Sequence, residues 1–333
     1  HFSTGKIYPY APFLDKICVN FAFFYYSLFP ASNESIDQVV GWVPVFFGMV
    51  MGVGLAVWLF SQSRCYGITF LIMLYFLTDE SFIFIFQYHR IDHHFLEAFF
   101  IWAWLMAATA FVRGRISDGI GLALGGLFIW GLIYSWPGAP ILAGAVVLQL
   151  IFFTLSGDDW VLKYLEFISG TFLIGGALGF LPLDLQFQAK FDIGMLSFLQ
   201  PGIFLGLGLI AKIFFGHFSG RRPLSKWGWL GVCGVVFAFF LAFFQNIWHG
   251  LVYLWSSHPF MQTIGELQPM VKEFASMKEI FNQIGGAKFF YPIGIFLASQ
   301  SLLRREGKIV NTFGIMVFIL SFSVIRYIRW SGF

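Results

Sequence analysis

The chain has 333 residues, of which 58% are hydrophobic and only 11% are charged, and its formal net charge is +3. Soluble domains carry about 25% charged residues, so this composition excludes a soluble globular domain and indicates a polytopic protein of the lipid bilayer. A net charge this small gives no reason to expect a nucleic-acid partner. Cys18, Cys65 and Cys233 have neither metal-binding nor redox spacing, so no disulfide framework is predicted.

Apolar runs long enough to cross a bilayer follow one another along most of the chain. A spanning helix needs about 20 apolar residues, and the sequence contains about ten candidates. A shorter apolar run at residues 17–30 precedes them and is typical of a helix in the membrane interface. The predicted fold class is therefore an all-α polytopic membrane protein. The expected spans are 39–60, 66–86, 95–112, 116–134, 140–155, 161–181, 195–215, 227–244, 289–303 and 309–327.

Basic residues mark one side of these spans. Lysine and arginine are enriched in cytoplasmic loops, and here they concentrate in alternate connections. The opposite short connections hold Arg90 and Lys190 and little else. The segment around residues 87–100 and the long polar loop 245–288 therefore lie on the non-cytoplasmic side of the predicted integral membrane protein. The basic connections carry Arg64, Arg113, Arg115, Lys163, Arg221, Arg222, Lys226, Arg304, Arg305 and Lys308.

The predicted organisation has four segments. Residues 1–38 form the tail of a first external loop with its interfacial helix, and residues 39–244 form transmembrane helices. Residues 245–288 form an external loop, which cannot lie in hydrocarbon because its backbone would lack hydrogen-bond partners. We expect this loop to fold over the external mouth of the bundle. Residues 289–333 contain the last two spans.

The stretch "QYHRIDHHFLEAFF", residues 87–100, places ionisable side chains between two apolar runs. Such residues are costly near a bilayer and mark functional sites. Asp92, His93 and His94 offer oxygen and imidazole ligands, which suit Mn²⁺ or Mg²⁺, with Zn²⁺ as an alternative. His93 and Glu97 are four residues apart and share a helix face. The alternative is a solvated loop with interfacial histidines.

Further motifs lie on the same predicted side. Glu266 lies in "MQTIGELQPM" of the long loop, Arg326 lies in "FSVIRYIRWSG" at the end of the last span, and Trp136 lies in "YSWPGAP" between two spans. Each has an ordinary alternative: a loop acid, a snorkelling arginine and a turn with an interfacial tryptophan. All three lie on the same predicted side of the membrane as Asp92, which favours a shared site.

Together these motifs resemble a known family. "IDHHFLE" is similar to the Asp-His-His motif of the catalytic subunits of archaeal-type oligosaccharyltransferases, and "TIGE", residues 263–266, is similar to their Thr-Ile-x-Glu loop motif. "SFLQPGIF" (197–204) and "IRYIRWSG" (325–332) also resemble family segments. The resemblance covers most of the chain. Asp-His-His is weak alone, but its combination with "TIGE" at matching topological positions is specific.

The resemblance implies a C-type glycosyltransferase fold, located in the cell membrane with its active site on the non-cytoplasmic face. It implies metal-dependent transfer of an oligosaccharide from a polyprenyl or dolichyl (di)phosphate carrier to the asparagine of Asn-x-Ser/Thr in a polypeptide. Asp92 and Glu266 are the implied catalytic residues, and they form the implied metal site together with His94. The implied substrate-binding residues are Arg326, Thr263, Ile264, Arg90, His93 and Trp136.

The sequence departs from the family pattern at both ends. The first Asp-x-Asp-like motif of the family would lie upstream of His1, and the soluble C-terminal domain of the family is not among these 333 residues. We therefore expect a fragment of a longer protein, inactive by itself. Two other functions stay open: a polyprenyl-phosphate-sugar-dependent transferase with a non-peptide acceptor, and a membrane cation transporter, which Asp79 and Glu80 within the second predicted span favour.

Overall fold

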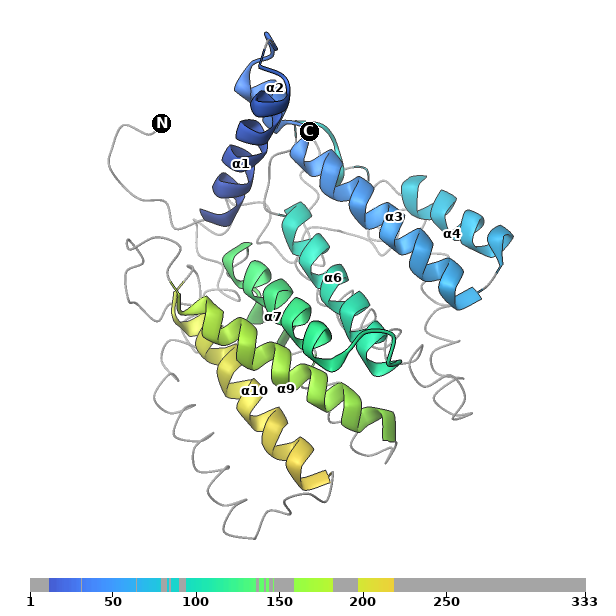
Figure 1. Ribbon diagram of the computed structural model, residues 1–333, viewed down its shortest axis with the longest axis vertical. Helices are drawn as coiled ribbons and strands as arrows, with labels where there is room; N and C mark the ends of the chain where they lie inside the picture. Colours follow the sequence, from blue (N-terminus) through green and yellow to red (C-terminus); the bar gives the residue numbers. More distant parts are fainter. Residues whose placement is uncertain are drawn as a thin grey trace, which may run out of the picture. The chain divides into compact units, whose positions relative to one another are not determined.

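The chain divides into two compact units, and the described helices lie almost entirely in the one formed by His1–Pro140 and Leu162–Pro223. Figure 1 shows these helices. In the part of the chain that the structure describes, every regular element is a helix. This all-helical architecture agrees with the predicted fold class. The computed structural model describes residues 12–30, 32–63, 65–78, 83, 85–89, 94–135, 138–140, 142–143, 146, 159–181 and 197–218.

Two helices precede the first long span. The helix α1 (Pro12–Leu28) occupies the predicted interfacial run but begins several residues earlier. The short helix α2 (Ile36–Val40) begins with a capping box, in which the Ser35 hydroxyl accepts from the Gln38 backbone N–H and Gln38 Oε1 accepts from the Ser35 backbone N–H. The pattern Ser-x-x-Gln therefore sets the start of α2.

Two helical hairpins follow. The first consists of α3 (Val43–Ser63) and α4 (Tyr66–Thr78), and the second consists of α6 (His94–Val112) and α7 (Asp118–Ser135). The helix α6 packs most extensively against α7 and also contacts α3. Each helix of these hairpins thus has a neighbour in the same unit along much of its length.

The turn between α6 and α7 is tight and depends on a glycine. Gly114 has φ +64°, a left-handed conformation that glycine adopts without a steric penalty. Its N–H donates to the Phe111 carbonyl at 2.9 Å, and the Arg115 N–H donates to the Ala110 carbonyl at 2.8 Å. These two bonds form a Schellman motif, which satisfies the last carbonyls of α6.

The helices α9 (Asp159–Gly179) and α10 (Leu199–Phe218) extend the bundle through close, glycine-mediated contacts. A Cβ at Gly175 would lie 2.8 Å from the Gly126 carbonyl oxygen of α7, and a Cβ at Gly208 would lie 2.9 Å from the Leu173 backbone nitrogen of α9. Small residues let helix backbones approach closely where lipid provides no hydrophobic driving force for association. Among the described helices, α3 contacts both α4 and α6, and from α6 onward the helices pack in chain order through α7 and α9 to α10.

Aromatic rings fill the space between α6, α9 and α10. The Trp104 and Phe167 ring centroids are 5.5 Å apart, and those of Phe172 and Phe204 are 4.9 Å apart. All four side chains are fully buried. The Trp104 indole N–H donates to Thr171 Oγ1 at 3.2 Å, so this core also contains a satisfied polar pair.

The described helices agree with the predicted spans in position. Four are long and apolar enough to cross a membrane: Ile36–Ser61, His94–Val112, Asp118–Ser135 and Leu199–Gly216. The helix α9 occupies the predicted span 161–181 and is not among these four. The span predicted at 66–86 is helical to Thr78 and at residues 83, 85 and 86. The predicted spans 227–244, 289–303 and 309–327, and most of 140–155, lie outside the described residues.

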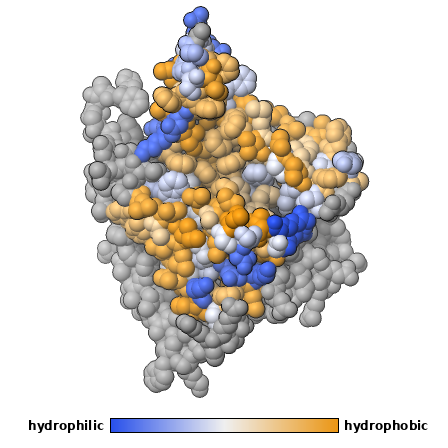
Figure 2. Space-filling model, in the orientation of Figure 1, coloured by the Kyte–Doolittle hydropathy of each residue, from blue (hydrophilic) through white to orange (hydrophobic). Residues whose placement is uncertain are grey.

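The surface of the described helices is largely apolar. Phe23 is 76% exposed, Val57 is 66% exposed and Phe70 is 65% exposed. In Figure 2 hydrophobic residues cover most of the described surface in view, and hydrophilic residues gather at the tip formed by α1 and α2 and in one lower patch. Apolar side chains in contact with lipid carry no desolvation cost, as expected for an integral membrane protein.

The contact between α9 and α10 provides a test of this packing. Gly176→Ala places a Cβ 2.8 Å from the Leu205 backbone nitrogen and 3.0 Å from the Pro201 carbonyl oxygen. Because backbone atoms cannot swing aside, the substitution should destabilise the protein by about 1–3 kcal/mol and lower its thermal unfolding midpoint in detergent. Gly206→Ala is the matched control, since nothing lies within 4 Å of its Cβ. Equal midpoints for Gly176→Ala and the wild type would contradict the packing.

Candidate functional site

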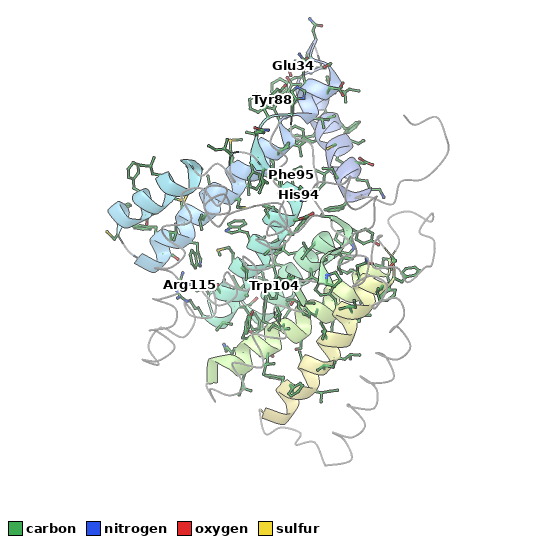
Figure 3. The ribbon with its side chains drawn as sticks, turned by 180° about the vertical axis from the view of Figure 1, so that it is seen from behind. Glu34, Tyr88, His94, Phe95, Trp104 and Arg115 are labelled. Atoms are coloured by element: carbon green, nitrogen blue, oxygen red, sulfur yellow. The ribbon has the colours of Figure 1, made fainter. Side chains whose placement is uncertain are left out.

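The predicted motif meets the described structure at the first residue of α6. His94 begins this helix, and the next two residues, Phe95 and Leu96, are fully buried. The Phe95 ring contacts the Phe47 ring of α3 with a centroid separation of 5.5 Å. His94 and Phe95 are labelled together at this end of α6 in Figure 3. The buried pair anchors the helix start, so the position of His94 is set by the core.

His94 has an acidic neighbour one turn along the helix. Its Nδ1 lies 3.3 Å from Glu97 Oε2, with 38% of the histidine side chain and 14% of the glutamate side chain exposed. A carboxylate only accepts hydrogen bonds, so Nδ1 carries the proton in this contact when the imidazole is neutral. The lone pair then resides on Nε2. Glu97 thus contacts His94, while His93, which the sequence places on the same helix face as Glu97, lies outside the described residues.

The segment before the motif is held by the tail of the first predicted loop. The Tyr88 hydroxyl donates to the Gln38 carbonyl at 3.2 Å, and the His89 N–H donates to the Gly41 carbonyl at 3.1 Å. The Trp42 and Tyr88 rings are 5.0 Å apart. A Cβ on Gly41 would lie 2.9 Å from Tyr88 Cε2, so this approach requires glycine or a displaced ring.

His89 has φ 65° and is the one non-glycine residue with positive φ in the described structure. This conformation costs on the order of 1 kcal/mol and persists where surrounding contacts impose it. The bond from its N–H to Gly41 is such a contact. The turn at residues 88–89 is therefore imposed by its contact with Gly41. Sequence reasoning missed this turn because the contact joins residues far apart in the chain.

The opposite end of α6 carries the basic residues. Arg115 Nη1 donates to Ser61 Oγ at the end of α3, at 3.0 Å. Partial burial, together with the neighbouring Arg115 guanidinium, lowers the pKa of Arg113. The helix α6 has 19 residues and is therefore roughly 28 Å long, close to the thickness of a bilayer core. His94 and the Arg113–Arg115 pair thus mark two ends of one membrane-length helix (Figure 3).

The helix α1 packs beside this bundle. The Phe13 ring lies 5.8 Å from the Phe100 ring of α6 and 5.6 Å from the Trp130 ring of α7. Burial raises the pKa of the Asp15 carboxyl. Burial, followed by the Asp15 charge, raises the pKa of the Cys18 thiol to about 11, so this thiol stays protonated at neutral pH.

His94 is the predicted site residue that the structure describes. Among the described residues no three His, Cys, Asp or Glu side chains form a metal-binding group. The donors at this helix start nevertheless fit a divalent cation, because an imidazole held through Nδ1 by a carboxylate presents Nε2 as a ligand. The other predicted residues lie outside the described residues; they are Arg90, Asp92, His93, Trp136, Thr263, Ile264, Glu266 and Arg326.

Comparison with known proteins identifies the fold. No protein-family model and no characterised protein sequence matches the chain. The described helices define an all-helical integral membrane protein. The whole chain is similar to the crystal structure of the Archaeoglobus fulgidus oligosaccharyltransferase in complex with Zn and sulfate, with a TM-score of 0.65 and 18% sequence identity.

This structural match covers 96% of the chain and 38% of the archaeal protein. The chain therefore spans less than two fifths of the length of the protein it matches. At this identity the likeness shows the fold alone, and it agrees with the oligosaccharyltransferase-like fold that the sequence motifs predict. The ten spans and the long external loop stay predictions.

Proposed function

We propose that this chain is the transmembrane core of a metal-dependent oligosaccharyltransferase. The reaction transfers an oligosaccharide from a polyprenyl or dolichyl (di)phosphate carrier to the side-chain nitrogen of asparagine in Asn-x-Ser/Thr. The observation that carries the proposal is the fold match over 96% of the chain, combined with the Asp-His-His motif, whose last residue, His94, begins α6. Fold alone does not define an activity, and the motif supplies the chemical groups.

The proposed topology has about ten spans, with the active site on the non-cytoplasmic face. The two ends of α6 support this orientation, since Arg113 and Arg115 follow one end and His94 begins the other. Basic residues concentrate on the cytoplasmic side. Residues 1–38 are the tail of the first external loop, and residues 245–288 are the loop that covers the site.

The proposed mechanism addresses a poor nucleophile. An amide nitrogen shares its lone pair with the carbonyl group and attacks weakly. Glu266 and Asp92 accept hydrogen bonds from the acceptor amide N–H groups, which favours a twisted amide with a more available lone pair. Arg326 binds the acceptor peptide, and Thr263 and Ile264 order the loop above it. Closure of this loop excludes water and suppresses hydrolysis of the carrier.

The departing (di)phosphate needs compensating positive charge. When bound by Asp92, His94 and Glu266, a divalent cation such as Mn²⁺, Mg²⁺ or Zn²⁺ supplies it. Arg90 lies beside the motif in sequence and supplies a second positive charge for the leaving group. His93 and Trp136 are the remaining residues that bind substrate, on the side of the lipid-linked carrier. The structure of the archaeal protein contains Zn and sulfate, which supports a site that binds both a divalent cation and an anionic group.

The catalytic proposal predicts the effect of two substitutions. In the full-length protein, Glu266→Gln and Asp92→Ala should each lower transfer to an Asn-x-Thr peptide by at least about 100-fold, because each removes a carboxylate that acts in the transition state. The assay is the appearance of glycopeptide from a lipid-linked oligosaccharide. Glu166→Gln in α9 is the carboxylate control and should retain activity. Full activity in both site variants would refute the assignment.

The orientation proposal predicts which side exposes Cys65. This residue is exposed in the connection between α3 and α4, on the proposed cytoplasmic side. In a Cys233→Ser background, a membrane-impermeant maleimide should label inside-out vesicles and leave intact cells unlabelled. Buried Cys18 should stay silent at pH 7, since its thiol pKa is about 11, and should gain reactivity as the pH rises toward that value. Labelling of Cys65 in intact cells would show that the topology is the reverse of the proposed one.

A further inference from the structure

We infer that Glu97 is a positioning residue that acts through His94, orienting its imidazole so that Nε2 faces the proposed divalent cation. The inference deepens the proposed function and rests on it. Its physical basis is the contact at the start of α6, where His94 Nδ1 and Glu97 Oε2 lie 3.3 Å apart.

The contact selects one tautomer of the histidine. An ionised carboxylate has no proton to donate, so the imidazole donates from Nδ1. A neutral imidazole protonated on Nδ1 keeps its lone pair on Nε2, the nitrogen directed away from Glu97. Metal-binding histidines are commonly held this way by a carboxylate, which fixes the ring orientation and raises the basicity of the ligand nitrogen.

The first turn of α6 gives the contact a rigid base. Phe95 and Leu96, which lie between His94 and Glu97 in the sequence, are fully buried. The Phe47 ring of α3 contacts both Phe95 and Phe99, with centroid separations of 5.5 Å and 4.8 Å. These rings hold the helix start on both sides of Glu97. The helical spacing of three residues then brings the two polar side chains together.

The partial burial of Glu97 also argues for a role. Its side chain is only 14% exposed, in a helix otherwise made of apolar and small residues after His94. A carboxylate near the bilayer is costly to retain. The N-terminus of α6 offsets part of this cost, because the helix dipole favours negative charge there. A glutamine has the same shape without the charge, so charge is the property to test.

The experiment measures Mn²⁺ affinity by electron paramagnetic resonance, using the full-length protein in lipid nanodiscs without substrate. Glu97→Gln should weaken Mn²⁺ binding by about 10–100-fold. Glu166→Gln is the matched control and should bind as the wild type does. Glu166 precedes Phe167, which contacts Phe111 near the far end of α6, so it lies far from His94.

A double-mutant cycle separates indirect from direct action. If Glu97 acts through His94, then Glu97→Gln should cause no further loss of Mn²⁺ affinity in a His94→Ala background. A full additional loss in that background would overturn the positioning role. Wild-type affinity in Glu97→Gln, with affinity lost in His94→Ala, would overturn the inference and leave the proposed function intact. Absence of Mn²⁺ binding by the wild type would overturn the metal site itself.

A second measurement needs no variant at Glu97. Nitrogen NMR of protein labelled with ¹⁵N-histidine reports the tautomer of each neutral imidazole, and His94→Ala assigns the signal of His94. In metal-free protein at pH 8, the expected result is a proton on Nδ1. A proton on Nε2 would contradict the contact with Glu97 and overturn the inference, whatever the folding behaviour of the variants.

Discussion

The absence of water from the bilayer core constrains every part of this protein. A backbone N–H or carbonyl group in hydrocarbon must find its partner within the protein, so the chain crosses as helices. Helix ends and polar side chains must be satisfied as well. Gln200 is fully buried at the start of α10, where its Oε1 accepts from the Ser197 N–H at 2.9 Å. The buried Ser135 hydroxyl donates to the Gly131 carbonyl at 2.7 Å.

The same constraint explains how the helices pack. Lipid is as apolar as the side chains, so close van der Waals contact has to hold the helices together. Glycines at the crossings of α7, α9 and α10 allow backbones to approach within contact distance, as at Gly175 and Gly176. Buried aromatic rings such as Trp104 and Phe167 fill the wider gaps. The resulting scaffold fixes the axial level at which each helix ends.

Charged side chains are consequently favoured at the helix ends, where they can meet water. The helix α6 is one membrane thickness long and carries the His94–Glu97 contact at one end and the Arg113–Arg115 pair at the other. The turn at Tyr88 and His89 is pinned to α2 through Gln38 and Gly41. The segment that precedes the Asp-His-His motif is therefore joined to the residues around α2 by direct hydrogen bonds.

The sequence by itself determined the class of protein, the positions of the described spans and the position of the motif at a helix start. These follow from local properties, since apolar length sets a span and Ser-x-x-Gln or glycine sets its ends. It placed α6 within one residue at its start. Only the tertiary structure decided that Tyr88 and His89 dock on α2, and that Glu97 meets His94 at 3.3 Å. The docking of Tyr88 on α2 joins residues about 50 positions apart. The contact between His94 and Glu97 depends on the residue at which α6 begins. The apolar pattern of the sequence specifies neither of these.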